Sequence, residues 1–430
     1  MPSWSDAWIS WLFLAVCAAG AGFTLNALSP LKGGRLLRVP AFLSSWIVGE
    51  AVAHHFAWQL IATLVFAWAG ALRYWPGWLG LALTLVSWGT LVVLFRRGRS
   101  ARHVVEQSLS GFVAAGAWPP VPWTKLWLPL SMGRRGVRRV RDVEYGRVGN
   151  KRLKLDVYLP GESKGRRPAV LQIHGGAWVL GTKREQGLPL LYHLASHGWV
   201  GFNVDYRLSP RATFPDQLVD IKRALAWIRE HADEYDVDPS FVVVTGGSAG
   251  GHLTALMALT QNAPQYQPGF EDADTSVQAA IPFYGVYCFV DRLGLFPKEF
   301  FTLLLEPWVM KKKLADAREA FVAASPIDQV GPDAPPFFVI HGDRDTLAPV
   351  QYARAFVAEL RKVSRAPVLY AELPGAQHAF DIFYSPRTVR VVEAVERFLD
   401  EVHRRSGQRV RALPDVTSPA TLEPAASLSD

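Results

Sequence analysis

The residues that decide the fold are Val244-Thr245-Gly246-Gly247-Ser248-Ala249-Gly250-Gly251. They join an apolar, β-branched run at 241–244 to a helix-like run at 249–259, so Ser248 falls at the junction of a strand and a helix. A turn this tight holds its serine in a strained backbone conformation, and the flanking glycines remove side chains that would collide. We therefore predict that Ser248 is a nucleophile with an exposed hydroxyl.

The start of a helix also suits the anion that a nucleophilic attack creates. Its first backbone N–H groups are free, and the helix dipole is positive there. The same glycines would occur in a turn that only packs a helix against a sheet. The strand before this turn and the helix after it favour the nucleophile.

A second motif, His174-Gly175-Gly176-Ala177-Trp178, immediately follows the apolar run that ends at Ile173. Ligands of open α/β sheets bind at this edge, beyond the carboxyl ends of the strands. Consecutive glycines let the backbone turn its N–H groups toward one point. We therefore predict an oxyanion hole made by Gly175, Gly176 and Ala249, with an ordinary strand-exit turn as the alternative.

Two later loops supply an acid and a base. The loop at 341–349 contains Asp345, which we expect to orient an imidazole, with Asp343 as the alternative acid. His378, in the loop after the last predicted strand, would take the proton of the serine and return it to the leaving group. The chain order serine, aspartate, histidine is that of the α/β-hydrolase triad, which predicts catalysis by Ser248, Asp345 and His378.

From residue 140 onward, short β-rich runs alternate with helical runs, which predicts a mainly parallel sheet with helices on both faces. We expect the first two strands to form an antiparallel ribbon. The expected strands are 140–145, 153–159, 169–173, 200–204, 241–244, 279–282, 337–340 and 368–372. The expected helices are 184–197, 217–231, 249–260, 351–363 and 388–404.

The residues before this region are apolar enough to suggest a membrane. Hydrophobic residues make up 50% of the chain, and three runs approach the length that crosses a hydrocarbon core, 8–28, 51–72 and 76–95. If the second run lies only at the interface, the count falls to two. Basic residues follow the first and third runs, which favours three spans with the catalytic part in the cytoplasm.

The composition of the chain indicates which classes of binding partner to expect. The formal net charge of +8 lies largely in arginines that flank the apolar runs, which favours lipid headgroups over nucleic acid. The two cysteines, Cys17 and Cys288, lie far apart and imply neither a disulfide framework nor a metal site. We expect a multi-pass protein of the inner membrane.

These observations divide the chain into four parts. Residues 1–102 would form the transmembrane region, and 103–139 a basic and aromatic linker at the membrane. The catalytic domain would cover 140–405, followed by a disordered tail at 406–430. Within the catalytic domain, 285–335 is either a lid over the site or a segment packed on the sheet.

The catalytic part resembles a known group, the hormone-sensitive-lipase-like and BD-FAE-like esterases of the α/β-hydrolase superfamily, which include membrane-anchored bacterial Lip carboxylesterases. The resemblance spans about 140 to 404 and rests on four features: the His174-Gly175-Gly176 turn, Asp205-Tyr206-Arg207-Leu208-Ser209-Pro210, the Ser248 elbow, and the loops of Asp345 and His378. It implies an α/β-hydrolase fold and a serine carboxylesterase or lipase without a cofactor or a metal. Its substrate would be a small-molecule or lipid ester.

The chain departs from the hormone-sensitive-lipase branch at two positions, where it has Ala177 and Gly247. Both departures favour the BD-FAE-like side. An amidase, a formamidase or a peptidase would use the same triad, so these activities remain alternatives. A catalytically inactive binding module would typically lack a triad residue, and all three are present. Acyl length and oligomeric state do not follow from the sequence.

Overall fold

The computed structural model describes residues 7–31, 35–161 and 165–412. Eight strands of this described part form one sheet in the order β1-β2-β4-β3-β5-β6-β7-β8. Strand β2 runs antiparallel to both β1 and β4, and the other neighbours are parallel. The strands are β1 (Val137–Val148), β2 (Lys151–Pro160), β3 (Arg167–Ile173), β4 (Val200–Val204), β5 (Val237–Gly247), β6 (Ala280–Phe283), β7 (Phe337–Gly342) and β8 (Val368–Leu373). The predicted α/β-hydrolase fold is confirmed.

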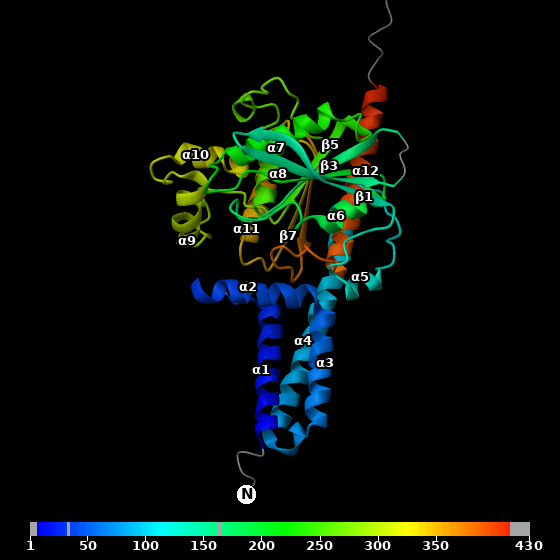
Figure 1. Cartoon of the computed structure of the whole chain (residues 1–430), viewed down its shortest axis with the longest axis vertical. Helices are drawn as coiled ribbons and strands as arrows, with labels where there is room; N and C mark the ends of the chain where they lie inside the picture. Colours follow the sequence, from blue (N-terminus) through cyan, green and yellow to red (C-terminus); the bar gives the residue numbers. More distant parts are fainter. Residues whose placement is uncertain (1–6, 32–34, 162–164, 413–430) are drawn as a thin grey trace, which may run out of the picture.

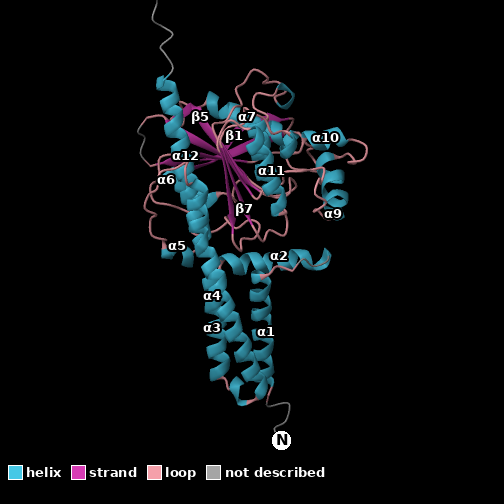
Figure 2. Cartoon of the chain, turned by 180° about the vertical axis from the view of Figure 1, so that it is seen from behind, coloured by secondary structure: helices cyan, strands magenta, loops and turns pink. Residues whose placement is uncertain are grey.

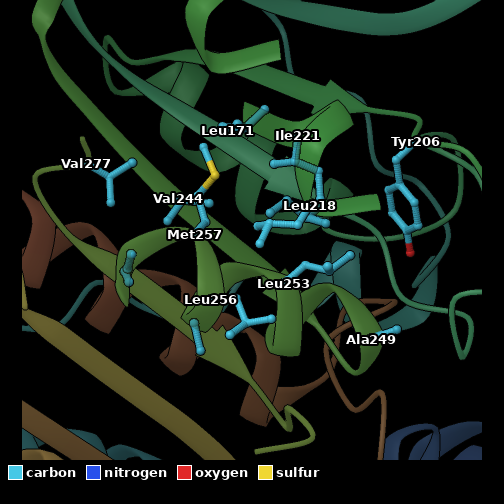
Figure 3. Packing of buried hydrophobic residues seen from close by; sticks show 14 of the residues in the cluster. Leu171, Tyr206, Leu218, Ile221, Val244, Ala249, Leu253, Leu256, Met257 and Val277 are labelled. Atoms are coloured by element: carbon cyan, nitrogen blue, oxygen red, sulfur yellow. The ribbon is translucent and has the colours of Figure 1, made fainter. Parts of the chain in front are cut away.

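Helices cover both faces of this sheet (Figures 1 and 2). Helices α7, α8 and α11 contribute to one buried core, and α6 and α12 contribute to the other. Figure 3 shows Leu253, Leu256 and Met257 of α8 packed among side chains of the sheet and of α7. The bounds are α6 (Leu188–Ser196), α7 (Asp216–Glu230), α8 (Ala249–Leu259), α11 (Val350–Val363) and α12 (Pro386–Ala412).

The C-terminal helix is longer than expected. Helix α12 continues through Gly407 to Ala412, because a single glycine weakens a helix without ending it. The first part of the predicted tail, 406–412, is therefore helical. The rest of that prediction, at 413–430, lies outside the described residues.

The segment 285–335, which the sequence predicts to be either a lid or a segment packed on the sheet, is partly packed on the catalytic domain. It contains α9 (Lys298–Phe300), the π-helix η4 (Phe301–Met310), α10 (Arg318–Ala323) and the 3₁₀-helix η5 (Pro326–Asp328). Leu305 and Val309 of η4 are buried in the core. Leu303 and Trp308 of the same helix are exposed. One face of the segment is thus packed on the domain, and another remains accessible.

The N-terminal part is a helical bundle that stands apart from the sheet (Figure 1). It comprises α1 (Trp8–Leu28), α2 (Arg35–Glu50), α3 (Val52–Trp68), the 3₁₀-helix η2 (Ala71–Arg73) and α4 (Trp75–Leu109). Helices α1, α3 and α4 lie side by side, and α2 crosses their end beneath the catalytic domain. The short α5 (Trp123–Trp127) follows α4 in the chain.

Two helices in the described residues, α1 and α4, are long and apolar enough to cross a membrane. A third span results only if the bent pair of α2 and α3 counts as one, and the bend between them is 94°. The predicted run 51–72 thus consists of α3, a turn and η2.

Helix α4 enters the catalytic domain without a break. The predicted span ends at residue 95 and the predicted transmembrane region at residue 102, but both positions fall inside this helix, which continues to Leu109. Ala101, Val105 and Leu109 recur every four residues and are buried with α12 against the sheet. The serine at 108 donates its hydroxyl to the carbonyl oxygen of Tyr370 in β8 at 2.7 Å. Burial of this apolar stripe therefore explains why α4 continues beyond the arginines that follow the predicted span.

A buried ion pair joins the two parts of the molecule. The carboxylate of Glu50, at the end of α2, accepts from the guanidinium of Arg387 in α12, and their side chains are 1% and 2% exposed. Ser385 donates to the same carboxylate at 2.7 Å. Removing one partner of such a pair leaves a buried charge without compensation.

We predict that Glu50→Gln lowers the free energy of unfolding by about 3 kcal/mol, because Arg387 would keep its charge in a buried site. Thermal unfolding of the purified protein in detergent measures this loss. Glu106→Gln is the matched control, since it removes an ion pair with Arg102 whose side chains are 46% and 33% exposed. Equal destabilisation by the two variants would contradict the prediction.

Candidate active site

Ser248 occupies a strained turn between β5 and α8. Its backbone angles are φ 59° and ψ −120°, which a non-glycine residue rarely adopts. A Cβ atom at Gly250 would lie 2.2 Å from the carbonyl oxygen of Ile173, and one at Gly246 would lie 2.5 Å from the same oxygen. These two glycines therefore let the turn approach the end of β3, as the sequence predicts.

His378 and Asp345 form a close pair. Nδ1 of His378 lies 2.7 Å from Oδ2 of Asp345, which is fully buried. The other carboxylate oxygen accepts the N–H groups of Leu347 and Ala348, each at 2.8 Å. Burial alone would raise the pKa of Asp345, but the interactions with His378 and His341 outweigh it and hold this pKa well below its usual range. The carboxylate is therefore charged when it orients the imidazole.

The alternative acid, Asp343, has a different partner. Its Oδ1 accepts the N–H of Gly375 at 2.7 Å, which ties its loop to the loop of His378. Burial raises the pKa of Asp343 despite this hydrogen bond. The geometry thus favours Asp345 over Asp343 as the acid that faces the imidazole.

A second imidazole, which the sequence interpretation missed, borders the acid. Nε2 of His341 lies 3.2 Å from Oδ2 of Asp345 and 2.9 Å from the carbonyl oxygen of Ala348. His341 is fully buried and precedes the acid by four residues. It contacts the same carboxylate oxygen as His378 and helps to fix its position. Its position in β7, directly before the acid loop, is the signal that could have pointed to it.

The predicted oxyanion hole needs one correction. The N–H of Gly175 donates to Oε1 of Gln186 at 2.7 Å and is not available to a ligand. The next residues turn into the left-handed region, with φ 116° at Gly176 and 52° at Ala177. Within the described residues no acceptor contacts the N–H of Gly176 or of Ala177. In the described residues these two N–H groups, rather than that of Gly175, are without an acceptor.

The other motif residues support this loop. Trp178 is buried, and its indole N–H donates to Nδ1 of His252 in α8 at 3.2 Å. The imidazole of His174 stacks on Tyr206, with ring centroids 4.3 Å apart. Both residues hold the loop against the domain.

One cavity joins the predicted catalytic residues. Ser248, Asp345 and His378 all line a space of about 690 Å³, together with Ala177. This volume is in the range of pockets that bind small molecules. The wall also includes Leu31, from the loop between α1 and α2, so the helical bundle contributes to the site.

Among the described residues, one group of side chains has donor atoms close enough to hold a metal ion: His193, His197 and Glu396. His193 lies on α6, His197 directly after it and Glu396 on α12, and none of the three lines the cavity. Nε2 of His193 contacts the carboxylate of Glu396 at 2.6 Å, so a hydrogen bond accounts for the contact. The cavity offers no such cluster within the described part of the chain.

Comparisons with known proteins identify the family of the chain. A family model described as BD-FAE matches residues 155–360. The chain is 43% identical to a probable carboxylic ester hydrolase, LipM, of Mycobacterium tuberculosis, over 91% of this chain and 93% of that protein. It is 45% identical to the esterase LipQ of the same organism, over 67% and 68% of the two chains. The solved structure of Thermogutta terrifontis esterase 2 covers 65% of this chain and 97% of its own, with 26% identity and a TM-score of 0.51.

The two acids give a test of the site. We predict that Asp345→Asn slows the reaction of Ser248 with a fluorophosphonate probe by roughly 10³-fold, because an amide cannot stabilise the imidazolium that forms. Asp343→Asn should slow the same reaction by less than about tenfold, since Asp343 only joins two loops. Mass spectrometry of the labelled peptide measures both rates. The reverse ranking would assign the role to Asp343.

Proposed function

Since the chain belongs to the Lip-type esterases of the α/β-hydrolase superfamily, which act on ester bonds, we propose that it is a membrane-anchored serine carboxylesterase. Its catalytic residues would be Ser248, Asp345 and His378. The observation that carries this proposal is the 2.7 Å contact between His378 and Asp345, in a cavity that both share with the strained serine. The triad needs neither a metal nor a cofactor.

The reaction follows from these positions. His378 takes the proton of Ser248 as the serine oxygen attacks the ester carbonyl, and it then gives this proton to the departing alcohol. The acyl group stays on the serine until a water molecule, deprotonated by the same imidazole, releases the acid. Asp345 keeps the imidazole in the correct tautomer and stabilises its charged form.

We assign the oxyanion hole to three backbone N–H groups, those of Gly176, Ala177 and Ala249. The first two are free of acceptors among the described residues and follow β3. Ala249 is the first residue of α8, where the N–H groups have no partner within the helix. Gly175 supports the loop through Gln186 instead.

The bundle supports a membrane anchor. Helices α1, α3 and α4 expose large apolar side chains, which a hydrocarbon environment would cover. We propose three crossings, with α3 as the second, because the basic residues after α1 and those after the apolar part of α4 then lie on one side. The catalytic domain would face the cytoplasm beside the more anionic leaflet.

The cavity wall suggests an amphiphilic ester as the substrate. Leu31 is 61% exposed and lines the cavity from the bundle side, and Leu295, Phe300 and Leu304 line it from the predicted lid segment. An apolar wall next to the membrane would accept an acyl chain that leaves the bilayer. We propose that 285–335 forms this acyl-binding wall. An amidase or formamidase would share the same catalytic groups.

We predict that Ser248→Ala keeps the fold and lowers the hydrolysis of p-nitrophenyl esters by at least about 10⁴-fold, because the nucleophile is lost. Initial rates on esters of increasing acyl length, measured with detergent-solubilised protein, provide the comparison. A matched series of p-nitroanilides tests the amidase alternative. Unchanged esterase activity in the variant would remove Ser248 from the mechanism.

The proposed topology has its own test. A green fluorescent protein fused after Asp430 should fluoresce, and alkaline phosphatase at the same place should be inactive, since the catalytic domain would be cytoplasmic. The control is the same pair of reporters fused after Arg73, between α3 and α4, where the pattern should reverse. Active phosphatase after Asp430 would place the catalytic domain outside the cytoplasm and contradict the proposed topology.

A further inference from the structure

Helix α2, which belongs to the N-terminal bundle, contacts the loop that carries His378. The indole N–H of Trp46 donates to the carbonyl oxygen of Ala379 at 2.9 Å. The ring of Phe42 meets the imidazole of His378 edge to face, with centroids 6.3 Å apart. Ser45 lies on the same face of the helix, one turn from Phe42. One face of α2 is therefore in contact with the histidine loop.

Gln377 connects this helix to both catalytic loops. Its side chain is buried, and Oε1 accepts the backbone N–H of His378 at 2.9 Å and that of Thr346 at 2.8 Å. Thr346 directly follows Asp345 in the chain. One amide oxygen thus joins the loop of the acid to the loop of the base.

The other end of this amide is held by α2. Nε2 of Gln377 donates to the hydroxyl of Ser45 at 2.9 Å, and this hydroxyl donates in turn to the carbonyl oxygen of Phe42 at 3.0 Å. Ser45 is also buried. A continuous series of hydrogen bonds therefore runs from α2 through Ser45 and Gln377 to the loop of His378. Because the amide oxygen and the amide nitrogen of Gln377 each have a partner, the orientation of this side chain is fixed.

Helix α2 is itself anchored on two sides. Its last residue, Glu50, pairs with Arg387 of α12, as described above. On the side of α1, the amide of Asn26 donates to the carbonyl oxygen of Ala41 at 2.7 Å and to the hydroxyl of Ser44 at 2.8 Å. The helix is thus a fixed support rather than a mobile neighbour of the loop.

We propose that Gln377 and Ser45 are positioning residues that let α2 hold the catalytic histidine and its acid in register. This inference rests on the proposed role of His378. Without the hydroxyl of Ser45, the amide of Gln377 keeps a buried donor without an acceptor and is no longer tied to α2. The loops of Asp345 and His378 then become more mobile, while the residues that line the substrate cavity stay in place. The turnover number therefore falls, and KM changes little.

The experiment compares Ser45→Ala with Ser44→Ala in the full-length protein in lipid nanodiscs. The two serines are neighbours on α2, but Ser44 hydrogen-bonds with Asn26 of α1, and in the described residues no hydrogen bond joins its side chain to the loop of His378. Ser44→Ala leaves α2 attached to α1, because the amide of Asn26 still donates to the carbonyl oxygen of Ala41. With p-nitrophenyl butyrate, we expect Ser45→Ala to lower kcat by roughly 5- to 10-fold at nearly constant KM, and Ser44→Ala to leave both constants within about twofold. Ser45→Thr keeps the hydroxyl and should restore most of the rate.

Hydrogen exchange of the backbone gives a second readout, which does not depend on catalysis. Ser45→Ala should speed exchange in the peptides that contain Thr346 and His378, and Gln377→Ala should speed it further, because Gln377 accepts both N–H groups. Equal kinetics for the Ser45 and Ser44 variants, or exchange that changes only within α1 and α2, would overturn the proposal. If the exchange changes while Ser248→Ala remains active, the support exists but the proposed function fails.

Discussion

The active site depends on how closely the turn at Ser248 approaches the end of β3. The carbonyl oxygen of Ile173 leaves no room for a Cβ atom at either Gly246 or Gly250. Because β3 and β5 are parallel neighbours, their ends meet at one edge of the sheet. The free N–H groups after β3 and the serine after β5 are therefore brought together by the strand pairing and not by a flexible loop.

The active site also requires that His378 and Asp345 stay in contact although they belong to separate loops. Their contact alone would leave both loops free to move together away from the serine. The buried amide of Gln377 restrains them, and it takes its own support from α2. The N-terminal bundle thus contributes to the geometry of the site as well as to the location of the protein.

Much of this could be predicted from the sequence, because short-range patterns determine it. Alternation of strands and helices predicted all eight strands, and the order of the motifs predicted the pairing of Asp345 with His378. The role of Gly175 could not be predicted, since its partner Gln186 follows eleven residues later and no periodicity links them. The same holds for Gln377 and Ser45, whose contact joins residues 332 positions apart. The extension of α4 was missed because the arginines after the apolar run resemble a membrane boundary.

The 35 residues of α4 form one uninterrupted helix, about 52 Å long, with one end packed on α1 and the other on α12 and β8. A loop between these two ends could gain or lose residues with little effect. In a helix, each inserted residue moves one end by about 1.5 Å and turns it by about 100° relative to the other. The stripe formed by Ala101, Val105 and Leu109 would then face away from the core. Natural variation in the length of this segment should therefore be far rarer than substitution within it.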